Sequence, residues 1–401
     1  MEYIIIGGGP AGLTFANKLL QEGEKDFIVL EACEEVGGLC RSKQVDNSPL
    51  DIGGGHFLDV KNKKALDFFF GFMPESEWDR YERDSRIFLR NRYVHHPIEA
   101  NIFEFDIDSQ VAYLESIAQA GCNTGVEKPD RFKEWCYWKL GERIAEDYMI
   151  PYNNKMFGEY LDELGVYWLE KLPDVSFADT IRSCLEHVAH AKQPGHAKFY
   201  YPKKHGYGEL WKRMGEALGN RLICEKRIKK LDIRNHYVET EDGLTYEGRN
   251  IITTIPWKSY DAILGLADEI RESIHELKHT SIYIEYIPKN YVNKAHWVYY
   301  PQEDIAYHRI LARENFVTES KGYWTETNAM RFNKNTPNVF FYNEYAYPVN
   351  TANKLRIMDR LLSACRKQGV YGLGRWGEHK HYNSDVVADK AMTLCEQLER
   401  A

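Results

Sequence analysis

The sequence of 401 residues lacks the features that mark secreted, membrane-spanning or nucleic-acid-binding proteins. Its eight cysteines include no C-x-x-C pair, which argues against a disulfide framework and against cysteine-ligated zinc. Its apolar runs are far shorter than the roughly 20 residues that span a bilayer, so we expect no membrane span. Acidic residues outnumber basic ones by 60 to 52, and a formal net charge of -8 argues against a nucleic-acid partner.

Internal repeats and low-complexity segments are also absent. The composition, 43% hydrophobic and 28% charged, is that of a folded soluble protein, and the length suffices for two or three packed units. At the N-terminus, Glu2 stands where a signal peptide needs basic charge, and the run Gly7–Gly9 interrupts any apolar segment. We therefore expect a cytoplasmic protein.

The first 31 residues carry the strongest motif. Apolar residues 3–6 predict a buried parallel strand, and Gly7-Gly8-Gly9-Pro10-Ala11-Gly12 follows as G-x-G-x-x-G. Apolar residues at helical spacing come next, Gly23 ends that helix, and residues 26–30 form a second predicted strand with Glu31 at its carboxyl end. This order is the dinucleotide-binding fingerprint of a Rossmann-type unit.

Each residue of the glycine loop has a physical role. Gly7 permits a tight turn, Gly9 lets backbone N–H groups approach a pyrophosphate, and Gly12 lets the helix pack on the strand. Pro10 and Ala11 lie in the same loop and complete the expected phosphate site.

The residues after the second strand indicate which dinucleotide is bound. Glu31 is expected to accept hydrogen bonds from a ribose diol, and a second glycine pair, Gly37-Gly38, precedes Leu39 and Arg41. This Glu-x5-Gly-Gly-x2-Arg stretch resembles the extension of FAD proteins in the glutathione-reductase and amine-oxidase superfamily, so it favours FAD over NAD. No second G-x-G-x-x-G follows a later strand, so an external electron donor would have to reduce the flavin.

The rest of the chain predicts an α/β protein whose flavin domain is discontinuous. Helical patterns without clear strands fill residues 106–196, and alternating β-branched and aromatic residues mark a sheet between residues 282 and 347. We predict a Rossmann-like FAD-binding domain from residues 1–90, 197–260 and 365–401, a helical insertion at 100–196, and a β-rich substrate domain at 261–364 with a strand from about 86–99.

Individual elements follow from the same patterns. The predicted helices include residues 132–147, 176–191 and a closing helix at about 385–400. The predicted strands of the returning flavin domain are residues 221–232, 237–240 and 251–256.

Several motifs resemble those of the UDP-galactopyranose mutase family, within the FAD amine-oxidase and protoporphyrinogen-oxidase superfamily. The most specific of them is the loop Leu50–Phe57, which resembles the G-G-H signature that lies against the flavin in that family. Further segments agree in order along the chain: Tyr93–Ile102, Pro151–Gly158, Trp297–Arg309, Gly374–Gly377 and Tyr382–Asp385.

The resemblance implies a flavoprotein of the isomerase class with a role in polysaccharide biosynthesis. Such enzymes interconvert the pyranose and furanose rings of a nucleotide sugar without net redox change, using reduced FAD. In the implied mechanism the flavin N5 forms an adduct with the anomeric carbon and displaces the nucleotide diphosphate. The expected partner is a nucleotide-diphosphate sugar resembling UDP-galactopyranose.

By match to the family, the expected catalytic residues are His56, Arg309 and Arg375. Bidentate arginines suit a diphosphate best, so Arg309 and Arg375 would form its clamp, while His56 would orient the flavin loop. The expected substrate-binding residues are Phe157, Lys171, Trp297, Arg309, Tyr345 and Tyr382. The remaining expected FAD contacts are Gly38, Leu39, Arg41, Gly54, Gly55, His56, Ile228, Gly374, Arg375, Asp385 and Val386.

Three departures from the family pattern leave the nucleotide and the sugar open. Phe157 stands where the family usually has Trp, and residues 276–282 lack an arginine that bacterial mutases place nearby. The loop after His56 also lacks a second histidine. Another nucleotide or sugar is therefore compatible with the sequence, as is a homo-oligomer.

Two other interpretations stay open. An FAD-dependent amine oxidase or protoporphyrinogen oxidase shares the fold but takes a hydride from its substrate; an aromatic cage would favour it, whereas converging arginines favour the mutase. A non-enzymatic flavin- or nucleotide-binding module is the third. Single residues also have ordinary structural explanations, because His56 can cap a turn and Arg309 can form a surface salt bridge. The spacing of His187, His190 and His196 lacks the partners of a metal site.

Overall fold

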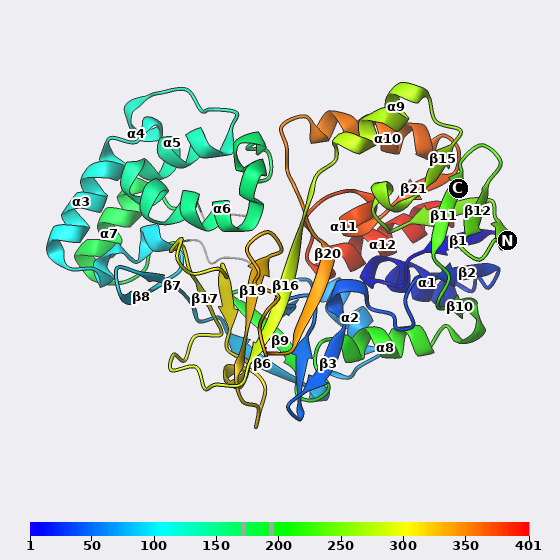
Figure 1. The fold of residues 1–401 in the computed structure, drawn as a ribbon, viewed down its shortest axis with the longest axis horizontal. Coiled ribbons are helices and arrows are strands. Elements are labelled where there is room, and N and C mark those ends of the chain that lie inside the picture. The colour runs from blue at the N-terminus through cyan, green and yellow to red at the C-terminus, as the bar shows by residue number, and fades with distance from the viewer. Residues whose placement is uncertain (170–173, 192–195, 401) are drawn as a thin grey trace.

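The computed structural model describes residues 1–169, 174–191 and 196–400 (Figure 1). A lobe of helices lies at one end, and a unit that contains both chain termini lies at the other. The long strands β16 (His279–Ile287) and β20 (Phe340–Pro348) run between them. No helix among the described residues is long and apolar enough to cross a bilayer.

The unit with both termini is built on a five-stranded parallel sheet, which confirms the predicted α/β class with a Rossmann-like unit. Its strands, in spatial order, are β10 (Leu222–Ile223), β2 (Phe27–Leu30), β1 (Tyr3–Ile6), β14 (Asn250–Thr253) and β21 (Val370–Gly372). Every residue of β1 is buried, as expected for a central parallel strand covered on both faces. The strands come from distant segments of the chain, from residues 3–6 near the N-terminus to residues 370–372 near the C-terminus.

The connection from β1 to β2 is helix α1 (Pro10–Glu22), whose first residue is the proline of the glycine loop. A Cβ on Gly12 would lie 2.0 Å from the carbonyl oxygen of Gly7, so only glycine lets the helix start this close to the strand. At the other end Gly23 adopts a left-handed conformation (φ 94°) and stops the helix, as predicted.

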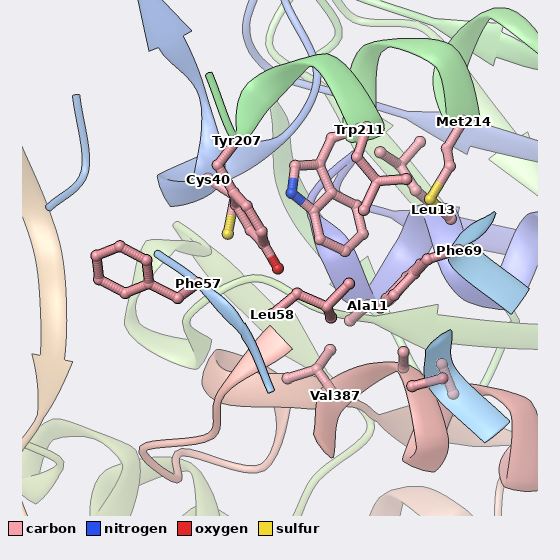
Figure 2. Close-up of a cluster of buried hydrophobic side chains, with 14 of the residues drawn as sticks. Ala11, Leu13, Cys40, Phe57, Leu58, Phe69, Tyr207, Trp211, Met214 and Val387 are labelled. Atoms are coloured by element: carbon pink, nitrogen blue, oxygen red, sulfur yellow. The ribbon is translucent and has the colours of Figure 1, made fainter. Parts of the chain in front are cut away.

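Helices α8 (Gly208–Glu216) and α12 (Ser384–Leu398) pack on α1. Figure 2 shows how their side chains meet the segment that follows the Gly53–Gly55 turn. The labelled cluster contains Ala11 and Leu13 of α1, Cys40, Phe57, Leu58, Phe69, Tyr207, Trp211, Met214 and Val387. The core of the terminal unit therefore also anchors the loop that carries the predicted G-G-H signature.

The second large sheet has seven strands. In spatial order they are β20, β16, β19 (Tyr323–Asn328), β18 (Arg309–Leu311), β17 (Trp297–Tyr299), β7 (Ser85–Leu89) and β8 (Arg92–His95). Neighbouring strands are antiparallel except β17 and β7. Residues 85–95 thus join strands that lie some 200 residues later in the chain.

The helical lobe has its own hydrophobic core. Its elements are η3 (Ile98–Ala100), η4 (Ile102–Glu104), α3 (Ile107–Ala118), α4 (Gly121–Thr124), α5 (Phe132–Ile144), the π-helical turn η5 (Ala145–Met149), α6 (Ile150–Phe157), η6 (Gly158–Glu163) and α7 (Phe177–Glu186). The predicted helix 132–147 is kinked at Gly141, which has non-helical dihedrals, and its last residues lie in the π-helical turn η5. The predicted helix 176–191 also ends early, since His187 adopts a left-handed conformation.

The predicted strand 221–232 is wrong as a single element. Glu225 has a positive φ of 59° and divides it, so that β10 pairs with β2 whereas β11 (Ile228–Asp232) pairs with β12 (Tyr237–Thr240) in another sheet.

The remaining strands are β3 (Ser42–Val45), β4 (Ser48–Asp51), β5 (Leu58–Asp59), β6 (Trp78–Glu82), β9 (Lys198–Pro202), β13 (Thr245–Glu247) and β15 (Ala262–Leu264). The remaining helices are η1 (Gly38–Cys40), α2 (Lys63–Phe70), η2 (Glu75–Glu77), η8 (Gly219–Arg221), η9 (Trp257–Ser259), α9 (Asp268–Ser273), η10 (Ile274–Glu276), η11 (Arg313–Asn315), α10 (Lys354–Arg366) and α11 (Gly374–Gly377).

Two alanine substitutions in the glycine loop compare a crowded position, Gly12, with an uncrowded one, Gly9. Gly12→Ala should lower the free energy of unfolding by about 3 kcal/mol, because its Cβ overlaps a backbone oxygen. Gly9→Ala should cost less than about 1 kcal/mol, since its Cβ would meet nothing closer than Gly38 Cα at 4.0 Å. Urea unfolding of both variants measures the difference, and equal losses would contradict this packing argument.

Candidate active site

A cavity of about 590 Å³ lies where the helical lobe, the seven-stranded sheet and the Gly53–Phe57 loop meet. Of the predicted site residues it is lined by Gly54, Gly55, His56, Phe157, Trp297, Arg309, Arg375 and Tyr382. These residues come from segments that are widely separated in the sequence, so only the tertiary fold brings them together.

The Gly53–Phe57 loop is held against the sheet by one carboxylate. The backbone N–H of Gly55 donates to Oε1 of Glu326 at 3.0 Å. Gly54 has a positive φ of 100°, and a Cβ there would lie 2.8 Å from the same oxygen. The glycine run therefore allows an approach to Glu326 that a larger residue would block.

Glu326 also forms an ion pair with Arg309, its direct cross-strand neighbour on β18. Arg309 donates to Oε2 of Glu326 from Nε at 3.0 Å and from Nη2 at 2.5 Å. Burial alone would raise the pKa of the Glu326 carboxyl, but the Arg309 charge outweighs it and lowers that pKa to about 2. Burial likewise opposes the charge on Arg309, yet Glu326 holds the pKa of Arg309 above its ordinary value.

The pairing leaves part of Arg309 available to the cavity. Its side chain keeps 21% of its surface exposed, whereas that of Glu326 is fully buried. Within the part of the chain that the structure describes, Nη1 of Arg309 has no hydrogen-bond partner. Arg309 is therefore fixed in place by Glu326 and can still donate to a ligand.

Arg375, at the start of α11, is held by backbone carbonyls. Nε and Nη2 donate to the Tyr382 carbonyl at 3.3 and 2.9 Å, and Nη1 donates to the Ala346 carbonyl at 3.2 Å. None of the described residues gives it a carboxylate partner. Burial lowers the pKa of Arg375 from its ordinary value, although a guanidinium keeps its proton. An anion in the cavity would stabilise this charge.

His56 is a neutral residue in this environment. Its Nδ1–H donates to the Gly54 carbonyl at 2.9 Å, and its ring stacks on that of Tyr207 with centroids 6.1 Å apart. Burial, helped by the charge of Arg375, lowers the pKa of His56 to about 3. The proton therefore stays on Nδ1 near neutral pH, and Nε2 can only accept.

The glycine loop and Glu31 lie outside this cavity and already contact each other. Glu31 accepts from Gly8 N at 2.6 Å and from Cys33 N at 2.8 Å, so its carboxylate also orders the loop. Gly9, at the N-cap of α1, provides no side-chain cap to the first helical N–H groups. These free donors beside an uncrowded glycine are a fitting site for a pyrophosphate.

The other predicted cofactor residues differ in their surroundings. Arg41 donates from Nε to the Gly38 carbonyl at 2.9 Å, and Gly374 packs against Ala11. Ile228 and Asp385 are buried, whereas Val386 is exposed and lies outside the cavity lining. A second cavity of about 460 Å³ starts immediately after Glu31 and is lined by Ala32, Glu34, Glu225, Arg227, Glu241 and Asp242.

Of the two predicted substrate tyrosines, Tyr382 lines the cavity and Tyr345 does not. Tyr345 packs on His279, with ring centroids 4.4 Å apart, and does not line the cavity. Tyr347, two residues later on β20, does line it and donates to Glu326 at 3.4 Å. The Tyr382 hydroxyl donates to Glu378 at 3.3 Å. Lys171 lies outside the described residues.

Sequence reasoning also missed several residues that line the cavity or support it. They are Arg83, Glu99, Tyr152, Tyr299, Tyr347 and the buried Glu326. A signal existed for four of them. Glu99, Tyr152 and Tyr299 stand within the motifs Tyr93–Ile102, Pro151–Gly158 and Trp297–Arg309, and Glu326 is a charged residue in the middle of an otherwise uncharged strand. Nothing local distinguishes Arg83 or Tyr347.

Comparisons with known proteins agree with this geometry. A family profile described as an NAD(P)-binding Rossmann-like domain matches residues 5–71. The crystal structure of reduced UDP-galactopyranose mutase superposes with a TM-score of 0.88 at 19% identity, covering 100% of this chain and 95% of that one. The chain has the fold of UDP-galactopyranose mutase. The predicted resemblance is thus confirmed at the level of fold.

Curated sequence relatives match over only part of their length. An uncharacterized protein of Methanothermococcus thermolithotrophicus is 47% identical over 66 residues, which are 16% of this chain and 62% of that protein. The flavin-containing amine oxidase A of Canis lupus familiaris is 24% identical over 286 residues, 64% of this chain and 49% of the oxidase. The chain thus spans about half the length of that oxidase. Flavoenzymes appear in both comparisons, which agrees with the predicted FAD.

Replacing the Glu326 carboxylate should show how much its ion pair with Arg309 contributes to the free energy of unfolding. Glu326→Gln should lower the free energy of unfolding at pH 7 by about 3 kcal/mol, because it leaves a buried guanidinium without its partner. Since the pKa of Glu326 falls from 4.5 to about 2 on folding, this contribution is fully present above pH 4.5 and is lost as the pH falls toward 2.

Urea unfolding at pH 7 and pH 3.5 measures this dependence. Glu239→Gln is the matched control, because Glu239 is a partly exposed carboxylate paired with Lys229 and should contribute less than about 1 kcal/mol. Equal losses for the two variants at pH 7 would contradict a structural role for the buried pair.

Proposed function

We propose that this protein is a reduced-FAD-dependent mutase that interconverts the pyranose and furanose forms of a nucleotide-diphosphate sugar. The observation that carries the proposal is that Arg309 and Arg375 line the same cavity as the Gly53–Phe57 loop. A nucleotide diphosphate brings at least two negative charges, and guanidinium groups bind such oxygens bidentately. Arg375 lacks a carboxylate partner among the described residues, so it would gain most from that anion.

The residues of this chain fit FAD. The first turn of α1 and Gly9 would bind the pyrophosphate, Glu31 the adenosine ribose, and the Gly54–His56 loop would lie beside the flavin ring. The cavity that begins at Ala32 offers room for the adenosine end. Bound in its reduced form, FAD supplies the nucleophile for the anomeric carbon.

The protein's own side chains have three tasks in this reaction. Arg309 and Arg375 hold the diphosphate and stabilise the charge that develops on it as its bond to the sugar breaks. His56, neutral and fixed by the Gly54 carbonyl, offers Nε2 as an acceptor toward the cavity. Trp297, Tyr299 and Tyr152 form apolar walls that exclude water from the reacting centre.

One observation favours a second candidate, an FAD-dependent oxidase. The matching amine oxidase is a flavin-containing enzyme, and the aromatic walls described above would also suit an amine that gives up a hydride. The two candidates differ in their need for cations, because an amine gains nothing from Arg309 and Arg375.

Activity assays separate the candidates. Anaerobic, dithionite-reduced holoprotein is incubated with UDP-, GDP- and dTDP-sugars, and the products are separated by chromatography. The mutase produces a ring isomer only while the flavin is reduced. Failure with all sugars, together with reduction of oxidised flavin by an amine, would establish the oxidase instead.

Flavin retention should depend on the open space at Gly9. Gly9→Ala should purify folded but with at least tenfold less bound FAD, because its methyl group occupies the position where the pyrophosphate approaches the backbone. The ratio of flavin to protein absorbance measures this. Full flavin occupancy in the folded variant would remove the glycine loop from the cofactor site.

Turnover should depend on Arg375, which has no carboxylate partner among the described residues. Arg375→Ala should keep its flavin and lose about 100-fold or more in turnover, as when one charge-stabilising group is removed from an active site. Arg366→Ala is the matched control, because Arg366 is an exposed cation on α10. Unchanged turnover in Arg375→Ala would exclude the residue from the mechanism.

A further inference from the structure

The cavity wall supplied by the helical lobe contains a carboxylate that the proposed mutase chemistry does not use. Glu99 lies in η3, is 7% exposed and lines the cavity. No other described residue donates a hydrogen bond to its carboxylate, which receives only its own backbone N–H. A buried carboxylate in this state lacks the donors that normally compensate for lost hydration.

The charges around Glu99 do not supply that compensation. The nearest cation acting on it is Lys139, whose Nζ is already paired with Asp174 at 2.5 Å. Burial raises the pKa of Glu99 to about 7, and Asp174 adds to that rise while Lys139 opposes it. Hydrogen-bond donors on a ligand would therefore find an acceptor here that the protein leaves unused.

The helical lobe also contributes flat aromatic side chains to the cavity. Trp135 of α5 and Tyr148 of η5 line it, and the Tyr148 ring lies 5.7 Å from that of Tyr152. Aromatic surfaces of this kind stack on nucleobases. A carboxylate repels phosphate, so the diphosphate belongs with Arg309 and Arg375 and the nucleoside belongs with Glu99.

We propose that the helical-lobe end of the cavity binds guanine, with Glu99 accepting hydrogen bonds from N1–H and the N2 amino group. This inference rests on the proposed function and specifies its substrate class as a GDP-sugar. Glu99 is then the residue that determines base specificity.

The argument for guanine comes from the hydrogen-bonding edges of the bases. Guanine presents two adjacent donors, N1–H and N2–H₂, which match the two oxygens of one carboxylate. Uracil and thymine present a single donor, N3–H, between two carbonyl oxygens that the carboxylate repels. Cytosine and adenine place a ring-nitrogen acceptor beside their amino group. Hydrogen bonds from N1–H and N2–H₂ favour the charged form of a carboxyl, so guanine binding would lower the pKa of Glu99 from about 7. The ionised form that guanine selects accepts two hydrogen bonds, and it favours guanine over each of the other bases.

Nucleoside diphosphates test this without requiring turnover. GDP and UDP are titrated into the oxidised holoprotein by calorimetry, for the wild type, for Glu99→Gln and for a control, Glu115→Gln. Glu115 is an exposed carboxylate on α3 of the same lobe, so the control removes the same charge away from the cavity. A thermal melt of each variant confirms that the fold is retained.

The wild type and the Glu115→Gln control should bind GDP at least tenfold more tightly than UDP, because one bidentate contact discriminates bases by about that factor. Glu99→Gln should lose at least tenfold in GDP affinity while UDP affinity holds or rises, since an amide can pair with the N3–H and a carbonyl of uracil.

Two different failures are distinguishable. If GDP and UDP bind the wild type equally, or UDP binds more tightly, the guanine inference is overturned and the mutase proposal stands; equal binding would assign Glu99 to the ribose hydroxyls shared by both ligands. If neither nucleotide binds, the nucleotide-sugar function itself fails, and the inference fails with it.

Discussion

The cavity depends on one buried carboxylate, Glu326. It lies on the central strand β19, pairs with Arg309 on the neighbouring strand and accepts the backbone N–H of Gly55. A single side chain thereby fixes the position of a cation and of the loop that carries His56 relative to the seven-stranded sheet. Because the desolvation cost of burying one charge is offset only by the other, the pair is stable as a unit and costly to break. Because both groups bind Glu326, the loop and the Arg309 guanidinium keep fixed positions relative to each other.

The remaining charges of the cavity follow from that arrangement. Arg309 is neutralised by Glu326, whereas Arg375 is held by backbone carbonyls alone among the described residues. The guanidinium of Arg83 adds a further cation to the cavity lining. Glu99 places a hydrogen-bond acceptor at the helical lobe. A ligand that is anionic at one part and rich in donors at another matches this polarity, and a nucleoside diphosphate has both properties. An amine substrate matches neither arginine, which is why the mutase is favoured over the oxidase.

Local patterns made much of the fold predictable. The strand 3–6, the glycine loop, the helix ended by Gly23 and the acid at position 31 depend on short-range sterics and hydrophobic spacing, which a sequence carries directly. The resemblance of motifs to a known family predicted that His56, Arg309 and Arg375 belong to one site, and all three line the cavity. Tyr347 was missed in favour of Tyr345, because β20 contains a register irregularity against β16 that no local pattern marks. Glu99 and Glu326 become meaningful only when the cavity forms, since their partners or their isolation depend on segments far along the chain.

The proposed function requires Arg309 and Arg375 to hold a diphosphate together, beside the loop that carries His56. A crystal structure of the holoprotein with a nucleoside diphosphate bound would test this arrangement. We expect phosphate oxygens within hydrogen-bond distance of both guanidinium groups, with Glu326 still paired to Arg309. A bound diphosphate that contacts neither arginine would exclude the proposed clamp.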